Sequence, residues 1–202
     1  MAAITTESEL RALYAAPAER ALRKELDHLD RHCRRFIEHS PFLVLATADA
    51  AGRQDATPRG GDPGFVLVAD EHTLLLPDRP GNNRLDSLAN LTYRPDVGLL
   101  FMIPGVDETL RVNGTAELRN DADLTGRFEA SRRSPTIVVR IAVREAYLHC
   151  AKALMRSRLW DSAARIERAE LPTMGQMLRD QIGSGTVESQ AEMVERYRGQ
   201  LY

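Results

Sequence analysis

The chain has 202 residues, of which 43% are hydrophobic and 28% charged, as in soluble globular proteins with one sizeable core. The 27 basic and 29 acidic residues nearly balance, so a broad attraction to nucleic acid or to an anionic membrane is not expected. Two cysteines, Cys33 and Cys150, cannot form a disulfide framework or a CxxC zinc pair. An acidic start and the lack of a long apolar run argue against a signal peptide and a transmembrane helix, so a reducing cytoplasm is the expected location.

The first forty residues have the pattern of a helix. An apolar residue returns after four, three, four and three positions, at Leu22, Leu26, Leu29, Cys33 and Phe36. This spacing predicts one apolar stripe along a single helix, with Cys33 as a small buried residue. Because Pro41 ends the pattern, we expect residues 1–40 to form an N-terminal helical segment.

Short apolar runs separated by turn signals follow. Strands are predicted at 42–47, 53–58, 65–68, 73–76, 97–103, 110–118 and 136–143. The first four recur at intervals of roughly ten residues, which favours an antiparallel meander or barrel over βαβ units. Gly114 is expected to mark a bulge within its strand.

Helices are expected between and after these strands. One opens at 80–83 and has an apolar face formed by Leu85, Leu88 and Leu91. A second is predicted at 121–130, and from Glu145 onward the pattern is mostly helical, ending with a charged helix at 187–197. We therefore predict a β domain at 41–148 and a helical extension at 149–202 that packs on the barrel or on a partner subunit.

One segment that can carry chemistry is Arg59-Gly60-Gly61, at the end of a predicted strand. Glycines let a ligand approach the backbone, and a guanidinium offers a planar fork to an oxyanion. The simpler explanation for this segment alone is a turn.

A second such segment contains Arg79, Asn82, Asn83 and Arg84 at the start of a predicted helix. Free N–H groups at a helix start, flanked by arginines, suit a phosphate. The simpler explanation here is a helix cap. In an antiparallel sheet the two segments can be neighbours, so the three arginines can converge on one phosphate; from the pattern alone, this and the simpler explanations stay open.

A third candidate lies after the last predicted strand. Lys152 and Arg156 are four residues apart and share a helix face, and Trp160 follows after four more. Such a face can meet an anionic planar ligand through charge and stacking. The alternative is a solvated basic face with Trp160 in the core.

The remaining histidines and cysteines give weaker signals. His28 and His32 have a spacing that can bind a metal, but no zinc-protease motif accompanies them, and two surface histidines are favoured. No motif supports Cys150 as a nucleophile. We expect no metal site.

Four runs of the chain together resemble a known family. They are FLVLATADAAGRQDATPRGGDPGFV, LLLPDRPGNNRLDSLANL, RPDVGLLFMIPGVDETLRVNGTAEL and HCAKALMRSRLW. In order and spacing they resemble the pyridoxamine 5'-phosphate oxidase-like FMN-binding split-barrel family, and the last run resembles a bacterial branch described as flavin-nucleotide-binding proteins. The resemblance covers roughly residues 18–160. It implies a mostly β (α+β), six-stranded antiparallel split barrel with flanking helices, which forms a homodimer and binds FMN at the subunit interface.

The resemblance also implies a set of cofactor-binding residues. Arg59 and Arg84 match positions on the phosphate side, while Asn83 replaces a residue that is usually basic, which gives Arg79 a role in the phosphate clamp. Thr109 matches a polar position near the ring on the partner subunit. The full expected set is Arg59, Gly60, Leu76, Pro77, Asp78, Arg79, Asn82, Asn83, Arg84, Thr109, Lys152, Arg156 and Trp160.

The vitamin B6 oxidase activity itself is not implied. The region after Arg59 lacks the family's substrate lysine, and the C-terminal region lacks its Arg-x-His. We therefore expect a flavin-dependent oxidoreductase acting on an unidentified small molecule, with a nicotinamide or oxygen as redox counterpart and no named catalytic residue. The alternatives are a flavin carrier or sensor without turnover, and a deazaflavin- or haem-binding protein on the same barrel.

Overall fold

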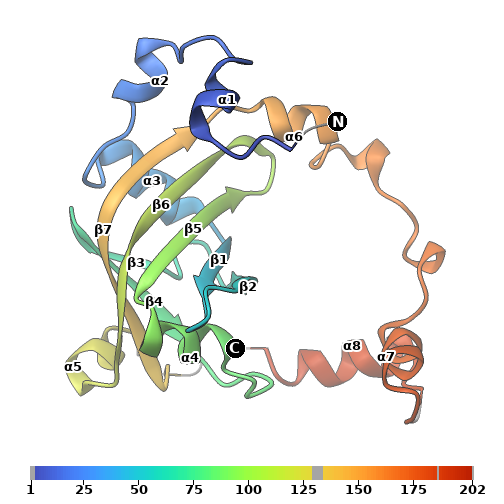
Figure 1. The fold of residues 1–202 in the computed structure, drawn as a ribbon. Coiled ribbons are helices and arrows are strands. Elements are labelled where there is room, and N and C mark those ends of the chain that lie inside the picture. Colours follow the sequence, from blue (N-terminus) through green and yellow to red (C-terminus); the bar gives the residue numbers. More distant parts are fainter. Residues whose placement is uncertain (1–2, 129–133, 186, 202) are drawn as a thin grey trace.

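The computed structural model describes residues 3–128, 134–185 and 187–201. Seven strands form one antiparallel sheet in the order β2–β1–β5–β6–β7–β4–β3 (Figure 1). The strands are β1 (Phe42–Ala48), β2 (Gln54–Gly60), β3 (Leu67–Asp70), β4 (Thr73–Asp78), β5 (Asp96–Ile103), β6 (Val106–Arg119) and β7 (Ile137–His149). The predicted antiparallel α+β fold is confirmed, and the described sheet is open, with seven strands where the resemblance implies six.

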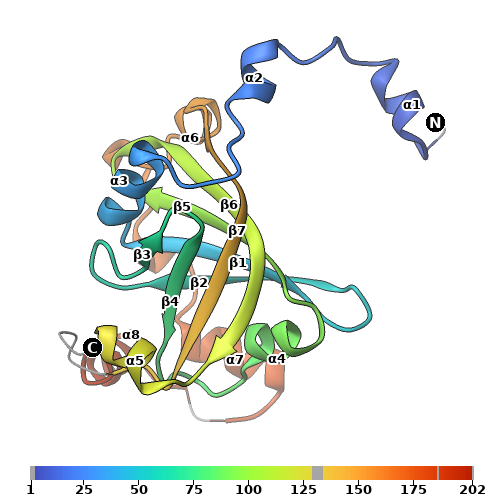
Figure 2. The same cartoon turned by 90° about the vertical axis from the view of Figure 1, so that its left-hand side faces the viewer.

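The described α-helices are α1 (Glu7–Arg11), α2 (Glu19–Arg23), α3 (Arg31–His39), α4 (Asp86–Tyr93), α5 (Ala122–Thr125), α6 (Lys152–Ser157), α7 (Met174–Ile182) and α8 (Gln190–Arg198). Helices α3 to α6 pack on the curved sheet, whereas α1 and α2 project beyond it (Figure 2). Residues 129 and 130 of the predicted helix at 121–130 lie outside the described part of the chain. None of the described helices has the length and apolar character needed to cross a membrane.

The core lies inside the curve of the sheet, where alternate residues of the strands point. Along β1, Leu43 and Leu45 are fully buried, and Phe101 of β5 pairs with Leu43. Helix α3 covers this core with Cys33 and Ile37. Alternation with a period of two therefore places every second side chain of these strands in the core, as expected for strands with one solvated face. The predicted burial of Cys33 is confirmed.

The single helix predicted across residues 22–36 is wrong. Helix α2 ends at Arg23, and Leu26 instead forms an isolated bridge with Ala146 of β7. A new helix, α3, begins after Asp30, whose carboxylate accepts hydrogen bonds from the backbone N–H groups of His32 and Cys33. This N-cap and the backbone pairing of Leu26 outweigh the helical spacing of the apolar residues.

The prediction of helix from Glu145 is also wrong, because β7 continues to His149. Strand β6 is long enough to pair with it: Asn113 pairs with Glu145, and Thr109 pairs with His149. The register shifts between Asn113 and Gly114, which confirms the predicted bulge. A Cβ atom at Gly114 would collide with the carbonyl oxygen of Ala142, so the bulge requires glycine.

Helix α4 begins later than predicted. Leu88 and Leu91 are buried as expected, but Leu85 is 55% exposed and precedes the helix in a left-handed conformation, with φ 59°. The loop from β4 to α4 is therefore longer than the sequence pattern indicates, and its residues face a pocket rather than the core.

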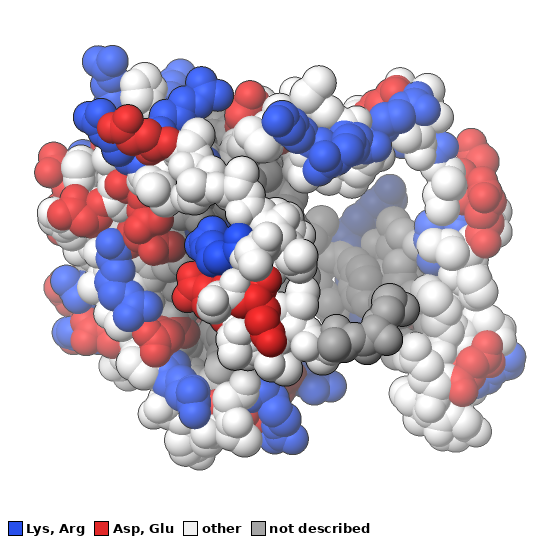
Figure 3. Space-filling model, turned by 45° about the horizontal axis from the view of Figure 1, so that its top comes forward, with Lys and Arg blue, Asp and Glu red and all other residues white. Residues whose placement is uncertain are grey.

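The C-terminal segment forms an arm that leaves the sheet at α6, curves round to α7 and turns back with α8 (Figure 1). Along the part of this arm that includes α6, Lys and Arg side chains gather on the surface (Figure 3). Lys152 and Arg156 are among the exposed residues there. The division into segments 1–40, 41–148 and 149–202 stays a prediction.

Candidate functional site

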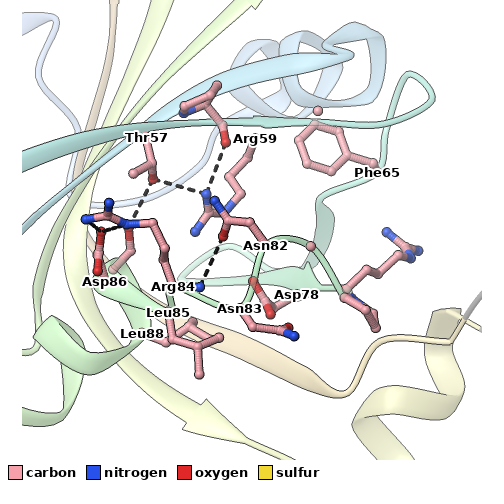
Figure 4. A pocket seen from close by; sticks show the side chains of 16 residues that line it. Thr57, Arg59, Phe65, Asp78, Asn82, Asn83, Arg84, Leu85, Asp86 and Leu88 are labelled. Carbon is pink, nitrogen blue, oxygen red and sulfur yellow. Dashed lines mark hydrogen bonds and ion pairs between the residues drawn. The ribbon is translucent and has the colours of Figure 1, made fainter. Parts of the chain in front are cut away.

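A pocket of about 460 Å³ lies between the end of β2 and the loop that joins β4 to α4 (Figure 4). A volume of this size falls in the range of small-molecule and cofactor sites, about 300–1,000 Å³. Its lining residues are Thr57, Pro58, Arg59, Gly60, Phe65, Asp78, Arg79, Pro80, Gly81, Asn82, Asn83, Arg84, Leu85, Asp86, Ser87 and Leu88. Both arginine-bearing segments identified in the sequence thus line one cavity.

Arg59 brings a positive charge to the pocket from the end of β2. Its Nη1 atom donates to the Thr57 hydroxyl at 3.1 Å and to the Pro58 carbonyl oxygen at 3.0 Å, and both acceptors are neutral. Among the described residues, no carboxylate forms a salt bridge with it. The guanidinium charge is therefore available to an anion, and it points toward the loop that carries Asn82 and Asn83 (Figure 4).

Arg84 lies on the other side of the pocket and already has an acidic partner. Its Nε and Nη2 atoms lie 2.9 and 2.8 Å from Asp86 Oδ2 (Figure 4). The pair is largely exposed, so the attraction is weak, and an anion of higher charge can compete for Arg84. Arg84 therefore contributes to the positive side of the pocket less strongly than Arg59 does.

The loop around Arg84 has an unusual backbone. Asn83 and Leu85 both have φ 59°, in the left-handed region that side chains other than glycine adopt rarely. The Asn82 side chain accepts a hydrogen bond from the Arg84 backbone N–H at 3.1 Å, which supports this conformation. Such conformations cluster at ligand-binding loops, where neighbouring structure maintains them.

Hydrogen bonds attach α4 to the β1–β2 hairpin and so set the width of the pocket. The Thr57 and Ser87 hydroxyls lie 3.0 Å apart. Further along, the Asn90 amide donates to Thr47 Oγ1 at 3.0 Å and to Asp55 Oδ2 at 2.8 Å. Because these groups are partly or fully buried, the bonds hold the two walls of the pocket in a defined arrangement.

Asp78 adds an acidic group at the end of β4. Burial raises the pKa of its carboxyl group, and the nearby Arg59 charge opposes that rise. A bound anion adds negative charge to the same cavity, which disfavours the ionised carboxylate further. Protonation of Asp78 would therefore remove a negative charge from the pocket.

Six predicted site residues lie elsewhere. Leu76 and Pro77 are buried in β4 and do not line the pocket. Thr109 is buried in β6, Lys152 and Arg156 are exposed on α6, and Trp160 donates from Nε1 to the Val106 carbonyl oxygen at 2.9 Å.

The length of β7 separates the two groups. Asp78 at the pocket pairs with Ile137, and Thr109 pairs with His149, twelve residues further along β7. At about 3.3 Å per residue the two places are roughly 40 Å apart along the strand, and neither Thr109 nor any residue of α6 lines the pocket within one copy.

Sequence reasoning missed several lining residues. Thr57 lies two positions before Arg59 on β2, so both face the same side of the strand, and this alternation is a signal that could have identified it. Ser87 and Phe65 have no comparable signal, because their places depend on where α4 and the β2–β3 loop pack.

The two histidines considered as a metal pair do not share a helix. His28 precedes α3 and contacts Asp27, whereas His32 lies within α3 and accepts from Arg31 Nε at 3.1 Å. Within residues 3–128, 134–185 and 187–201, no group of three or more His, Cys, Asp or Glu side chains is placed to hold a metal ion. Cys150 is an exposed free thiol.

Comparisons with known proteins place the fold. The family model described as pyridoxamine 5'-phosphate oxidase matches residues 29–150. No curated protein matches the chain. Among solved structures, HupZ from Group A Streptococcus has a TM-score of 0.51 at 17% identity, covering 60% of this chain and 99% of that one.

Two further structures are less similar. A protein from Clostridium acetobutylicum, related to general stress protein 26 of B. subtilis, has a TM-score of 0.44 at 12% identity, covering 58% of this chain and 85% of that one. The heme storage protein HutZ from Vibrio cholerae has a TM-score of 0.42 at 15% identity, covering 60% and 93%. At these identities the likeness concerns the fold alone. Because the family model spans more than half of the chain, including every strand that the structure describes, the chain belongs to the pyridoxamine 5'-phosphate oxidase-like split-barrel family.

Proposed function

We propose that the chain binds FMN, with the phosphate of the cofactor in the pocket between β2 and the β4–α4 loop. The observation that carries the proposal is the meeting of Arg59 and Arg84, from segments 25 positions apart in the chain, in one cavity. A phosphate monoester needs charged donors from more than one direction, and two guanidinium groups on opposite walls supply them.

The residues of the pocket fit a phosphate. Arg59 has no acidic partner among the described residues, and Asn82 and Asn83 add polar groups on a loop with accessible backbone. Arg79 lines the same cavity and is proposed as a third member of the clamp. Gly60 lines the pocket beside Arg59, and the Asp78 backbone at the end of β4 gives the rest of the cofactor an edge to lie along.

A homodimer would complete the site. The proposal is supported by an apolar row on the outer face of the sheet: Phe42 pairs with Met102, and Val44 pairs with Leu100, and all four side chains are partly exposed. In a dimer, Thr109, Lys152, Arg156 and Trp160 of the second copy would approach the ring end of the cofactor, although within one copy they do not line the pocket.

FMN supplies hydride and single-electron transfer when bound. The chain's own contribution is to hold the phosphate, to orient the cofactor and to set the charge around it. We propose an oxidoreductase acting on a small molecule, with a nicotinamide or oxygen as counterpart. A flavin carrier or sensor is the second candidate, favoured by the lack of the family's substrate-binding lysine after Arg59. Deazaflavin and haem are the alternative cofactors, and HutZ on a similar fold is named as a heme storage protein.

The visible spectrum of the purified chain tests the cofactor. Protein from a host that makes no deazaflavin is expected to show a flavin spectrum and to release FMN on denaturation. A haem spectrum, or a colourless protein that does not bind added FMN, would refute the proposal. Steady reduction by a nicotinamide would then separate the oxidoreductase from the carrier.

Replacement of Arg84 by alanine tests the phosphate seat. The change is expected to weaken FMN binding by about 1.5–3 kcal/mol, the contribution of one charged hydrogen bond. Arg94→Ala is a matched control, because Arg94 lies at the other end of α4, outside the pocket. An unchanged dissociation constant for Arg84→Ala would remove Arg84 from the site.

A further inference from the structure

A second cluster of cationic and aromatic side chains lies around Tyr147, near the end of β7. The ring of Tyr147 on β7 is contacted by Lys24 Nζ, 5.0 Å from its centroid, and by the Arg111 guanidinium carbon, at 5.3 Å. The His149 ring lies 5.0 Å from the Tyr147 ring. The register explains the grouping: Tyr147 pairs with Arg111 across β6 and β7, and His149 follows on the same face.

The positive charges of this cluster are not balanced by described carboxylates. Lys24 Nζ donates to the Leu148 carbonyl oxygen at 2.7 Å, and Arg111 makes no described ion pair. The nearest acidic residue on the same face of β7, Glu145, accepts a hydrogen bond from Asn113 at 2.5 Å. Two cations gathered on one aromatic ring, without an acid between them, form an electropositive site.

His149 adds a polar atom that lacks a partner. Its Nε2 atom is buried and has no hydrogen-bond partner among the described residues. An unpaired buried donor or acceptor is unfavourable, so a ligand that pairs with it gains. Burial and the charges of Arg111 and Lys24 lower the pKa of His149, so its ring is neutral at pH 7. The cluster therefore combines two cations with a neutral imidazole that has hydrogen-bonding capacity to spare.

We propose that Lys24, Arg111 and His149, arranged around Tyr147, bind a small oxyanion, namely the carboxylate or phosphate group of a small molecule. Guanidinium and ammonium groups would supply the charge-assisted hydrogen bonds, and the imidazole would supply a neutral one. A metal ion does not suit this cluster, because both charged side chains repel it. No residue of the phosphate-binding pocket belongs to the cluster.

The cluster shares no residue with the pocket, so the binding of an anion here does not require flavin binding. In the proposed dimer, Thr109, which pairs with His149, would bring the cluster of one copy to the cofactor of the other. The oxyanion would then belong to the redox substrate. This last step rests on the proposed function, whereas the binding of the anion does not.

The test is an NMR titration of the apoprotein that follows the His149 ring, identified by comparison with His149→Asn. Inorganic phosphate and benzoate are added separately, against sodium chloride of equal ionic strength. One of them or both are expected to shift the His149 resonances saturably. The anion also offsets the charges of Arg111 and Lys24, so the pKa of His149 is expected to rise on binding. A response to phosphate alone indicates a phosphate monoester, and a response to benzoate alone indicates a carboxylate.

Charge-neutral variants locate the site. Arg111→Met is expected to weaken binding about tenfold or more, and Lys24→Met to weaken it less, because Lys24 is exposed. Since Lys24 is exposed, its variant also stays informative if Arg111→Met does not fold. Arg144→Met is the matched control, because Arg144 is an exposed β7 arginine that forms an ion pair with Asp96 and takes no part in the cluster, so its loss should leave binding unchanged.

Two results would overturn the inference. One is a His149 ring that neither anion moves beyond the effect of sodium chloride. The other is equal weakening by Arg111→Met and Arg144→Met, which would indicate general charge screening. Arg59→Met removes a cation from the pocket and is expected to leave the His149 titration unchanged, so failure of the flavin proposal and failure of this one give different results.

Discussion

The Thr57 hydroxyl lies 3.0 Å from the Ser87 hydroxyl, joining the end of β2 to the first turn of α4 across 30 positions of the chain. The same Thr57 oxygen accepts a hydrogen bond from Arg59 at 3.1 Å. One hydroxyl group thus connects the helix wall of the pocket to the guanidinium on the strand wall. The position of Arg59 is therefore coupled to the packing of α4.

Replacement of Thr57 by valine removes this hydroxyl while keeping the shape of the side chain. FMN binding is expected to weaken by about 1 kcal/mol, because Arg59 loses an acceptor that positions it. Quenching of FMN fluorescence on titration measures the change. Thr92→Val, which removes an exposed hydroxyl bonded only within α4, should bind FMN as the unchanged chain does. Equal affinities for Thr57→Val and the unchanged chain would show that Arg59 needs no such support.

Replacement of Asp78 by asparagine removes a negative charge from the pocket. FMN binding at neutral pH is expected to tighten by about 1 kcal/mol, the order of magnitude for one repulsion between charges near a protein surface. Burial raises the pKa of Asp78, so the carboxylate gains its proton as the pH falls. The difference between the two proteins should therefore narrow toward acidic pH. Asp123→Asn, on α5 and outside the pocket, is the control; weaker binding by Asp78→Asn would mean that the carboxylate contacts the ligand favourably.

Replacement of Gly114 by alanine places a methyl group against the Ala142 carbonyl carbon and oxygen. Backbone atoms cannot yield as a flexible side chain does, so the bulge between β6 and β7 must shift. The free energy of unfolding is expected to fall by about 2–3 kcal/mol in a urea titration. Gly199→Ala should change the free energy of unfolding little, because the added methyl group would lie 3.6 Å from the nearest atom, the Arg196 carbonyl oxygen. A Gly114→Ala chain as stable as the original would show that the bulge tolerates a side chain.

The two thiols should differ in reactivity. Burial raises the pKa of Cys33 to about 12, whereas Cys150 is exposed. A thiol reagent at mildly alkaline pH is expected to label Cys150 in the native protein and Cys33 only after unfolding. In the unfolded chain Cys33 ionises near pH 9, so its contribution to stability is complete below that pH and is lost as the pH rises toward 12. In Cys33→Ala the free energy of unfolding should no longer show this fall between pH 9 and pH 12. Rapid labelling of Cys33 in the native protein would contradict its burial.

Most strands could be predicted because their signal is local. The alternation of Leu43 and Leu45 with less buried neighbours shows in the sequence, and so does the turn that follows β1. The extension of β7 through Tyr147 to His149 could not be predicted, because these residues become a strand only by pairing with β6. For the same reason Leu26, at a helical spacing, pairs with Ala146 instead.

The sequence by itself determined that Arg59 and Arg84 follow predicted strands. It also placed glycines next to Arg59 and asparagines next to Arg84, where a ligand can approach the backbone. It also determined the family, since four runs in order carry that resemblance. Only the tertiary structure decided that these two arginines line one pocket and that Lys24 and Arg111 meet on the Tyr147 ring. The physical reason is that register and packing join residues far apart in the chain, and no local pattern records the distance between them.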